Sequence, residues 1–173
     1  MKLVKTEDAV GQVLCHDITQ IIKGVTKDAV FRKGHVVKEE DIPVLLSVGK
    51  EHLYIWEKEE GMLHENEAAE ILRKICQGSN MHPSDVKEGK IELIADIDGV
   101  LKIDVEKLNR INSLGEIMIA SRHGNFPIKK GDKIAGTRVI RLVIHEDKMK
   151  AAEEIGGDEP IFQVRPYEKK KVG

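Results

Sequence analysis

Two short segments combine cationic or hydrogen-bonding side chains with a glycine, and each could hold an anion. They are Arg32-Lys33-Gly34-His35 and Arg122-His123-Gly124-Asn125. Arg and Lys bind phosphate through charge-assisted hydrogen bonds, and glycine lets the backbone approach a ligand closely. The same residue types are also ordinary in solvated turns. The candidate ligand contacts from these segments are Arg32, Lys33, His35, Arg122, His123 and Asn125.

A third basic segment surrounds the Gly131-Asp132 turn and runs into an apolar stretch, which predicts a strand over residues 137–144. Arg138 and Arg141 are three residues apart, so they would face opposite sides of a regular strand. A buried arginine needs either an acidic partner or a bound anion. An internal salt bridge and ligand binding both remain open, and Lys130 and Arg138 join the candidate contacts.

Cys15-His16-Asp17 contains reactive residue types, but its geometry argues against joint chemistry. In a strand, Cys15 and His16 point to opposite faces and cannot readily share an ion pair or a metal. A buried cysteine beside a surface histidine is therefore favoured over catalysis or metal binding. Cys15 and Cys76 form no Cys-x-x-Cys unit, as expected for free thiols in a reducing compartment.

Tyr54 and Trp56 alternate with aliphatic residues in a predicted strand. They could line a slot for a flat ring, but packing in the core is favoured because the chain has only six aromatic residues to fill it (Phe 3, Tyr 2, Trp 1). No histidine pair with metalloprotease spacing and no nucleophile elbow is present.

The composition is that of a globular protein with a heavily charged surface: of 173 residues, 34% are charged and 40% are hydrophobic. A formal net charge of −2 and few aromatic residues argue against nucleic-acid binding. The amino terminus lacks the apolar region of a signal peptide, and no apolar run reaches the roughly 20 residues needed to span a bilayer. We therefore expect a cytoplasmic protein that is not embedded in a membrane.

Periodicity and turn residues predict short elements along the chain. Helices are expected after Asp41, over residues 66–77, after Asp104 and over residues 146–155, with a single helical turn at Thr6. Strands are expected near residues 13–22, 53–56, 117–119 and 161–165, and a hairpin is expected around Asp98-Gly99.

These elements indicate an α+β fold in which short strands form β-clip or barrel-like sub-domains with four or five short helices. The polar, Gly- and Pro-containing stretch 78–89 is the best candidate boundary. The predicted organisation is an amino-terminal sub-domain over residues 1–78, a second, β-rich sub-domain over residues 89–168, and a linker over residues 169–173.

Three segments carry a resemblance that covers nearly the whole chain: TEDAVGQVLCHDIT from Thr6, FRKGHVVKEEDIPVLLSVG from Phe31, and residues 130–142. They resemble the amino-terminal half of molybdopterin-binding proteins related to molybdopterin molybdenumtransferase. In that family an α/β pterin-binding domain follows, and Val172-Gly173 resembles its first strand. The Thr-Gly-Asx-Glu loop of that domain and the Ser-x-x-Asp-Gly-Tyr-Ala stretch of the full transferases do not occur here.

The resemblance implies an amino-terminal module acting in molybdenum cofactor biosynthesis, which helps to position a phosphorylated pterin or its nucleotide-activated form and is not catalytically complete alone. It implies molybdopterin as the cofactor, with molybdate and Mg²⁺ used by the full-length protein, and a homodimer. The alternative is a non-catalytic dimerisation or protein-interaction scaffold. A third possibility, an enzyme acting on sugar acids, would require a metal site.

Overall fold

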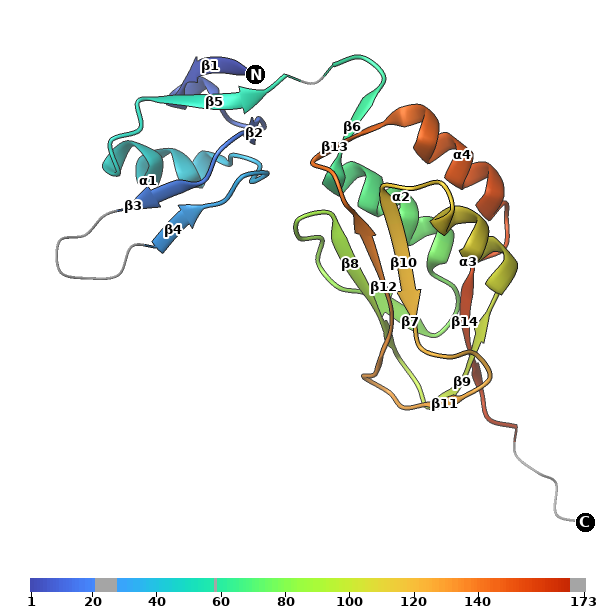
Figure 1. Cartoon of the computed structure of the whole chain (residues 1–173). Coiled ribbons are helices and arrows are strands. Elements are labelled where there is room, and N and C mark those ends of the chain that lie inside the picture. The colour runs from blue at the N-terminus through green and yellow to red at the C-terminus, as the bar shows by residue number, and fades with distance from the viewer. Residues whose placement is uncertain (21–27, 58, 169–173) are drawn as a thin grey trace, which may run out of the picture. The chain divides into compact units, whose positions relative to one another are not determined.

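The computed structural model describes residues 1–20, 28–57 and 59–168 (Figure 1). The chain divides into two compact units, Met1–Glu59 and Glu60–Gly173. Both combine helices with short antiparallel strands, and four α-helices lie in the described residues. The predicted α+β class and helix number are confirmed; the described strands form small open sheets and close no barrel. No described helix has the length and apolarity required to cross a membrane.

The amino-terminal unit is built around a three-stranded antiparallel sheet with the order β1-β5-β2. Its core is aliphatic, with Leu14, Leu45, Leu53 and Ile55 at most 3% exposed. Pro43 occupies the first turn of α1, where its missing N–H costs nothing. The elements are β1 (Lys2–Lys5), a 3-10 turn (Thr6–Asp8), β2 (Val13–Leu14), β3 (Ile18–Gln20) paired with β4 (Asp28–Phe31), a second 3-10 turn (Glu39–Asp41), α1 (Ile42–Ser47) and β5 (His52–Trp56).

The described residues of the carboxy-terminal unit form two small sheets, one two-stranded pair and three helices. The four-stranded sheet has the order β10 (Ile117–Ser121), β12 (Lys133–Val139), β8 (Lys90–Ala95), β7 (Met81–Pro83), and the three-stranded sheet has the order β11 (Pro127–Ile128), β9 (Gly99–Ile103), β14 (Phe162–Pro166). β6 (Met62–His64) pairs with β13 (Val143–His145). The helices are α2 (Glu65–Cys76), α3 (Val105–Asn112) and α4 (Glu146–Gly156).

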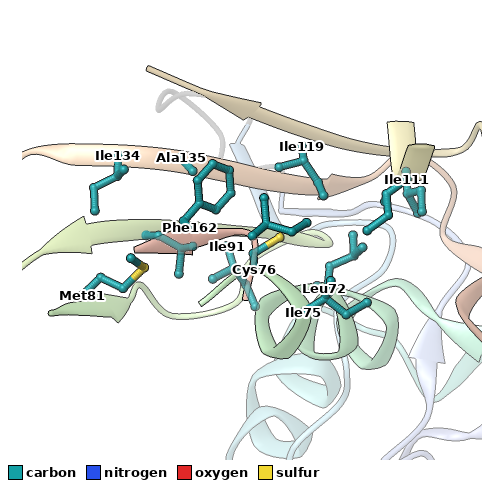
Figure 2. Close-up of a cluster of buried hydrophobic side chains, with 14 of the residues drawn as sticks. Leu72, Ile75, Cys76, Met81, Ile91, Ile111, Ile119, Ile134, Ala135 and Phe162 are labelled. Atoms are coloured by element: carbon teal, nitrogen blue, oxygen red, sulfur yellow. The ribbon is translucent and has the colours of Figure 1, made fainter. Parts of the chain in front are cut away.

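Helix α2 packs against β8 and β12 and forms the centre of the core in this unit (Figure 2). Leu72 and Cys76 on the helix meet Ile91 from β8 and Phe162 from β14, and all four side chains are fully buried. Buried residues alternate with more exposed ones on β8 and β10, and on β12 after the register shift between Lys133 and Ala135. The four-stranded sheet therefore has one face in the core and one open face.

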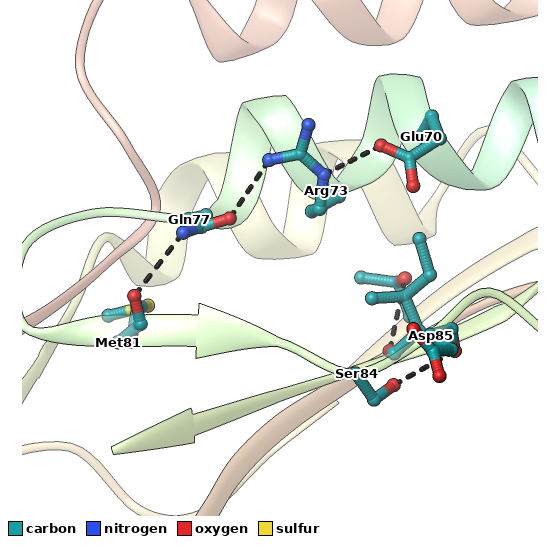
Figure 3. A network of polar contacts seen from close by, with 8 residues as sticks. Glu70, Arg73, Gln77, Met81, Ser84 and Asp85 are labelled. Carbon is teal, nitrogen blue, oxygen red and sulfur yellow. Dashed lines mark hydrogen bonds and ion pairs between the residues drawn. The ribbon is translucent and has the colours of Figure 1, made fainter. Parts of the chain in front are cut away.

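A chain of side-chain hydrogen bonds fastens the end of α2 to β7 (Figure 3). Arg73 Nε donates to Glu70 Oε2 over 2.7 Å, and Arg73 Nη1 donates to Gln77 Oε1 over 2.9 Å. Gln77 Nε2 in turn donates to the Met81 carbonyl over 3.3 Å. Because Met81 is the first residue of β7, this network fixes the start of β7 relative to the end of α2.

The predicted hairpin around Asp98-Gly99 is wrong. β8 pairs with β12 and β7, whereas β9 pairs with β14 and β11, so the two consecutive strands belong to different sheets. Both strands do form. Their alternation of apolar and polar residues is the same whichever strand each one pairs with, so it does not identify the partner. The actual tight hairpin turn is Glu88-Gly89, with φ of 49° and 69° between the mutually hydrogen-bonded Lys87 and Lys90.

The structure divides the chain at Glu59/Glu60, and the stretch 78–89, where we expected the boundary, lies within the carboxy-terminal unit. The physical reason is α2: its buried stripe packs on β8 and β12, which come later in the sequence. The composition of residues 78–89 indicates a polar loop. It does not indicate which of the two cores the preceding helix packs into. The predicted linker, residues 169–173, lies outside the described residues.

Candidate functional site

The open face of the four-stranded sheet gathers side chains from three neighbouring strands. Register places Met118, Arg138 and Lys90 side by side across β10, β12 and β8. The next row is Ala120, Gly136 and Glu92. Arg138 and Lys90 are exposed, while Thr137 and Ile91 beside them point into the core. Long cationic side chains therefore border the two small residues Ala120 and Gly136.

Two adjoining hollows lie on this face and share Lys90, Glu92 and Arg138. The first, called here the Gly136 hollow, has a volume of about 430 Å³ and extends over β10 and β12. The second, called the Ser84 hollow, has a volume of about 460 Å³ and extends toward the turn that carries Lys87 and Glu88. Both volumes fall in the range of roughly 300 to 1,000 Å³ usual for small-molecule sites.

The residues shared by the two hollows are two cations, Lys90 and Arg138, and one carboxylate, Glu92; the Ser84 hollow adds Asp85 and Glu88 against Lys87. Glu92 pairs with Lys133 Nζ at 2.9 Å and Lys90 Nζ at 3.3 Å, and hydrogen bonds from Lys133 and then Lys90 lower the pKa of its carboxyl. Arg138 forms no ion pair with any residue in the described part of the chain. Lys90 lies directly opposite Arg138, and like charges in this position repel. Glu92 offsets part of that repulsion by pairing with Lys90, and an anion bound at Arg138 would offset the rest.

Two carboxyl groups lie close to Arg138. Glu65, the first residue of α2, is buried; its pKa is raised to about 7, mainly by that burial and also by the Glu88 carboxylate, while Arg138 opposes the shift. Glu88 has a left-handed φ of 49°, which is uncommon for a residue with a long side chain. A Cβ atom at Gly89 would lie 3.0 Å from both Glu65 Cβ and the Val139 carbonyl, so this turn fits tightly against α2 and β12.

The structure places some predicted residues in the site and others elsewhere. Arg138 lines both hollows and Arg122 lines the Gly136 hollow, although Arg122 also pairs with Asp132 at 3.3 Å. Lys130 lines neither hollow; its backbone N–H donates to Asp98 Oδ1 over 2.7 Å. Of the three, only Arg138 is at the junction of the hollows.

His123 and Asn125 contact other side chains of the same unit. Asn125 has a left-handed φ of 63°, and its Oδ1 accepts a hydrogen bond from Lys102 Nζ over 2.7 Å. The His123 ring lies 6.0 Å from that of Phe126. Neither residue lines the two hollows.

The first basic cluster belongs to the amino-terminal unit. His35 Nε2 is 2.6 Å from Asp41 Oδ2, and the same oxygen accepts a hydrogen bond from the Lys38 backbone N–H. His35 therefore links the segment that follows β4 to the residue that precedes α1. The Lys33 backbone N–H donates to Asp17 Oδ1 over 2.7 Å, and the side chains of Arg32 and Lys33 are exposed. His35 thus has a structural partner.

Cys15 is buried and His16 is exposed, as predicted, but both lie in a bend after β2 and not in the strand from which that prediction was argued. Burial raises the pKa of the Cys15 thiol and raises that of Cys76 to about 12. Both cysteines are free and buried. The residues that the structure describes contain no group of three or more His, Cys, Asp or Glu side chains that could hold a metal ion.

Two expectations about side-chain position are wrong. β12 ends at Val139, so Arg141 is not on the strand; it is exposed and pairs with Glu116 at 3.0 Å. Tyr54 and Trp56 do not pack in the core, since they remain 49% and 36% exposed. Leu53 and Ile55 on the same strand occupy the core instead, and a strand that is apolar on both faces does not reveal which face turns inward.

Sequence reasoning did not single out Lys90, Met118 or Gly136. A glycine in the interior of a strand does signal close approach of a ligand or another backbone. The cationic pair was not predictable, because Lys90 and Arg138 are neighbours only through the register of β8 and β12.

Comparison with known proteins bears on the amino-terminal unit. The family model described as "Domain of unknown function (DUF8806)" matches residues 3–57. That range corresponds closely to the amino-terminal unit and leaves the sheet with the two hollows outside it. No curated protein and no solved structure matches the chain.

Proposed function

We propose that the chain is a cytoplasmic module of molybdenum cofactor biosynthesis that positions a phosphorylated pterin, with the phosphate held at Arg138 and Lys90. The observation that carries the proposal is Arg138, which is exposed at the junction of two hollows, faces Lys90, and forms no direct ion pair among the described residues. The pterin is suggested by the resemblance of residues 6–19, 31–49 and 130–142 to molybdopterin-binding proteins.

The two cations suit a phosphate in complementary ways. A guanidinium presents a planar fork that can donate two parallel hydrogen bonds to phosphate oxygens, whereas an ammonium acts as a compact point charge. Glu92 would repel an anion, but its carboxylate is already matched to Lys90 and Lys133. In this proposal the module holds and orients the ligand, and insertion of molybdenum from molybdate with Mg²⁺ takes place on a partner domain.

Isothermal titration with 6-hydroxymethylpterin phosphate tests the proposal. Arg138→Gln should weaken binding by about 10- to 100-fold, because a hydrogen bond to a charged group contributes about 1.5 to 3 kcal/mol. Arg141→Gln is the matched control, since Arg141 is three residues away, exposed and paired with Glu116. Equal affinity of the wild type and Arg138→Gln, or no binding by either, would refute the proposal.

The open face of the β1-β5-β2 sheet supports a second candidate, a homodimerisation scaffold. Tyr54 and Trp56 project from this face beside Leu3, which is 52% exposed and paired in register with Tyr54. Exposed aromatic residues gathered on one face are typical of interaction surfaces.

Analytical ultracentrifugation distinguishes this candidate. A concentration-dependent dimer should dissociate in Tyr54→Ser/Trp56→Ser, while Tyr167→Ser, which removes an exposed tyrosine from the carboxy-terminal unit, should leave it intact. A wild-type protein that stays monomeric at high concentration would exclude the scaffold.

A further inference from the structure

Gly136 lies in the middle of β12, after the register shift between Lys133 and Ala135, and neither its φ nor its surroundings require a glycine. It lies outside the left-handed φ range, and a Cβ atom built on it would meet no atom within 4 Å. Glycine in the interior of a strand is unfavourable, because it loses more backbone entropy than other residues and offers no side chain to pack. This backbone position is open to the Gly136 hollow, where a side chain would occupy the space.

Neighbouring residues give that hollow a shallow apolar floor with charged edges. Ala120 lies opposite Gly136 in register, so neither β10 nor β12 places a long side chain at this point. Met118 and Arg138 occupy the adjacent row, and Arg122 and Lys133 also line the hollow. A thioether makes favourable contacts with aromatic rings, and a guanidinium stacks on them.

We infer that the Gly136 hollow is the subsite for a flat, fused-ring heterocycle whose attached phosphate lies at Arg138 and Lys90. The inference rests on the proposed function, because it uses the same cationic junction, and it adds the ring subsite and the residue that keeps it open. Phosphorylated pterins and purine nucleotides share this chemistry. Gly136 acts as a specificity determinant by leaving room for the ring.

Three probes separate the contributions of phosphate and ring: ribose 5-phosphate, GMP and 6-hydroxymethylpterin phosphate. For the wild type, a ring-bearing phosphate should bind at least tenfold more tightly than ribose 5-phosphate. Gly136→Phe should abolish that advantage while changing the affinity for ribose 5-phosphate less than twofold. Gly136→Ala, which adds only one methyl group, should retain most of the advantage.

Folding of the variants is checked by thermal unfolding, and Ala120→Phe provides a second, independent block of the same floor. The midpoint for Gly136→Ala should equal or exceed that of the wild type, because the added Cβ meets open space. The ring subsite is supported if a variant keeps the wild-type unfolding midpoint but no longer binds ring-bearing phosphates more tightly than ribose 5-phosphate.

The outcomes separate the two proposals. If all three probes bind equally through Arg138 and Gly136→Phe has no effect, the ring subsite is refuted and the anion site stands. If no probe binds in an Arg138-dependent manner, the proposed function fails together with the inference. If GMP binds more tightly than the pterin phosphate, the ring subsite stands and the pterin assignment is refuted.

Discussion

At the scale of single residues, the site combines groups that would be unfavourable in a purely structural sheet. Arg138 opposes Lys90, Glu65 is buried, and Glu88 adopts a left-handed φ. Unfavourable local arrangements of this kind concentrate at functional sites. Glu65 and Glu88 can each be tested separately from ligand binding.

Glu65 should make stability depend on pH. Its folded pKa of about 7 lies above the ordinary value of 4.5, so the folded protein binds this proton more strongly than the unfolded chain. Stability is therefore unaffected below about pH 4.5, falls as pH rises toward 7, and carries the full cost above that. Glu65→Gln should match the wild type at low pH and exceed its unfolding free energy by up to about 3 kcal/mol at pH 8.

Urea unfolding at the two pH values measures this difference, with Glu106→Gln on the exposed surface of α3 as the control. A difference between Glu65→Gln and the wild type that did not change with pH would contradict the prediction.

Glu88 should store a small amount of backbone strain. A left-handed conformation costs a residue with a Cβ roughly 1 to 2 kcal/mol, whereas Asn tolerates it better. Glu88→Asn should therefore raise the free energy of unfolding by about 0.5 to 1 kcal/mol. Glu88→Gln removes the charge without relieving the strain, so a gain of equal size in both variants would attribute the effect to charge alone.

At the scale of elements, helices were predictable because their signals are local. α3 begins where Asp104 predicts it, and Asp104 Oδ1 accepts a hydrogen bond from the Lys107 backbone N–H over 3.1 Å. α2 combines acidic residues in its first turn with Arg73 and Lys74 in its last, as the helix dipole favours. Strand pairing was less predictable, since partners are distant in sequence.

The cap of α3 provides a quantitative test of this local contribution. Asp104→Ala should lower the free energy of unfolding by about 1 kcal/mol, because the Lys107 N–H loses its acceptor. Asp104→Asn should retain most of the stability, since Asn also caps helices well. Chemical denaturation monitored by circular dichroism measures both variants; a loss of the same size in Asp104→Asn would show that the carboxylate charge, not the cap, matters.

At the scale of the whole molecule, the described residues contain two separate hydrophobic cores, one in each compact unit. Leu45 belongs to the first and Leu72 to the second, and both side chains are fully buried. The single tryptophan, Trp56, lies in the amino-terminal unit, so its fluorescence reports on that unit. Most helical residues belong to α2, α3 and α4 in the other unit.

The two cores should respond separately to mutation. Leu45→Ala should lower the midpoint of the fluorescence transition, and Leu72→Ala that of the far-ultraviolet circular dichroism transition, each through a loss of about 2 to 5 kcal/mol. Parallel denaturation curves with both probes measure the shifts. If either variant moved both transitions together by the same amount, the units would be one cooperative system.

The sequence by itself determined the α+β class and the four helices, because caps and periodicity act over a few neighbouring residues. Only the tertiary structure decided that β8 and β9 enter different sheets, that Tyr54 and Trp56 face outward, and that Lys90, Gly136 and Arg138 meet on one open face. These features depend on register and on which face of a strand is covered. Both are settled by contacts between segments far apart in the chain, where the local pattern is the same for either choice.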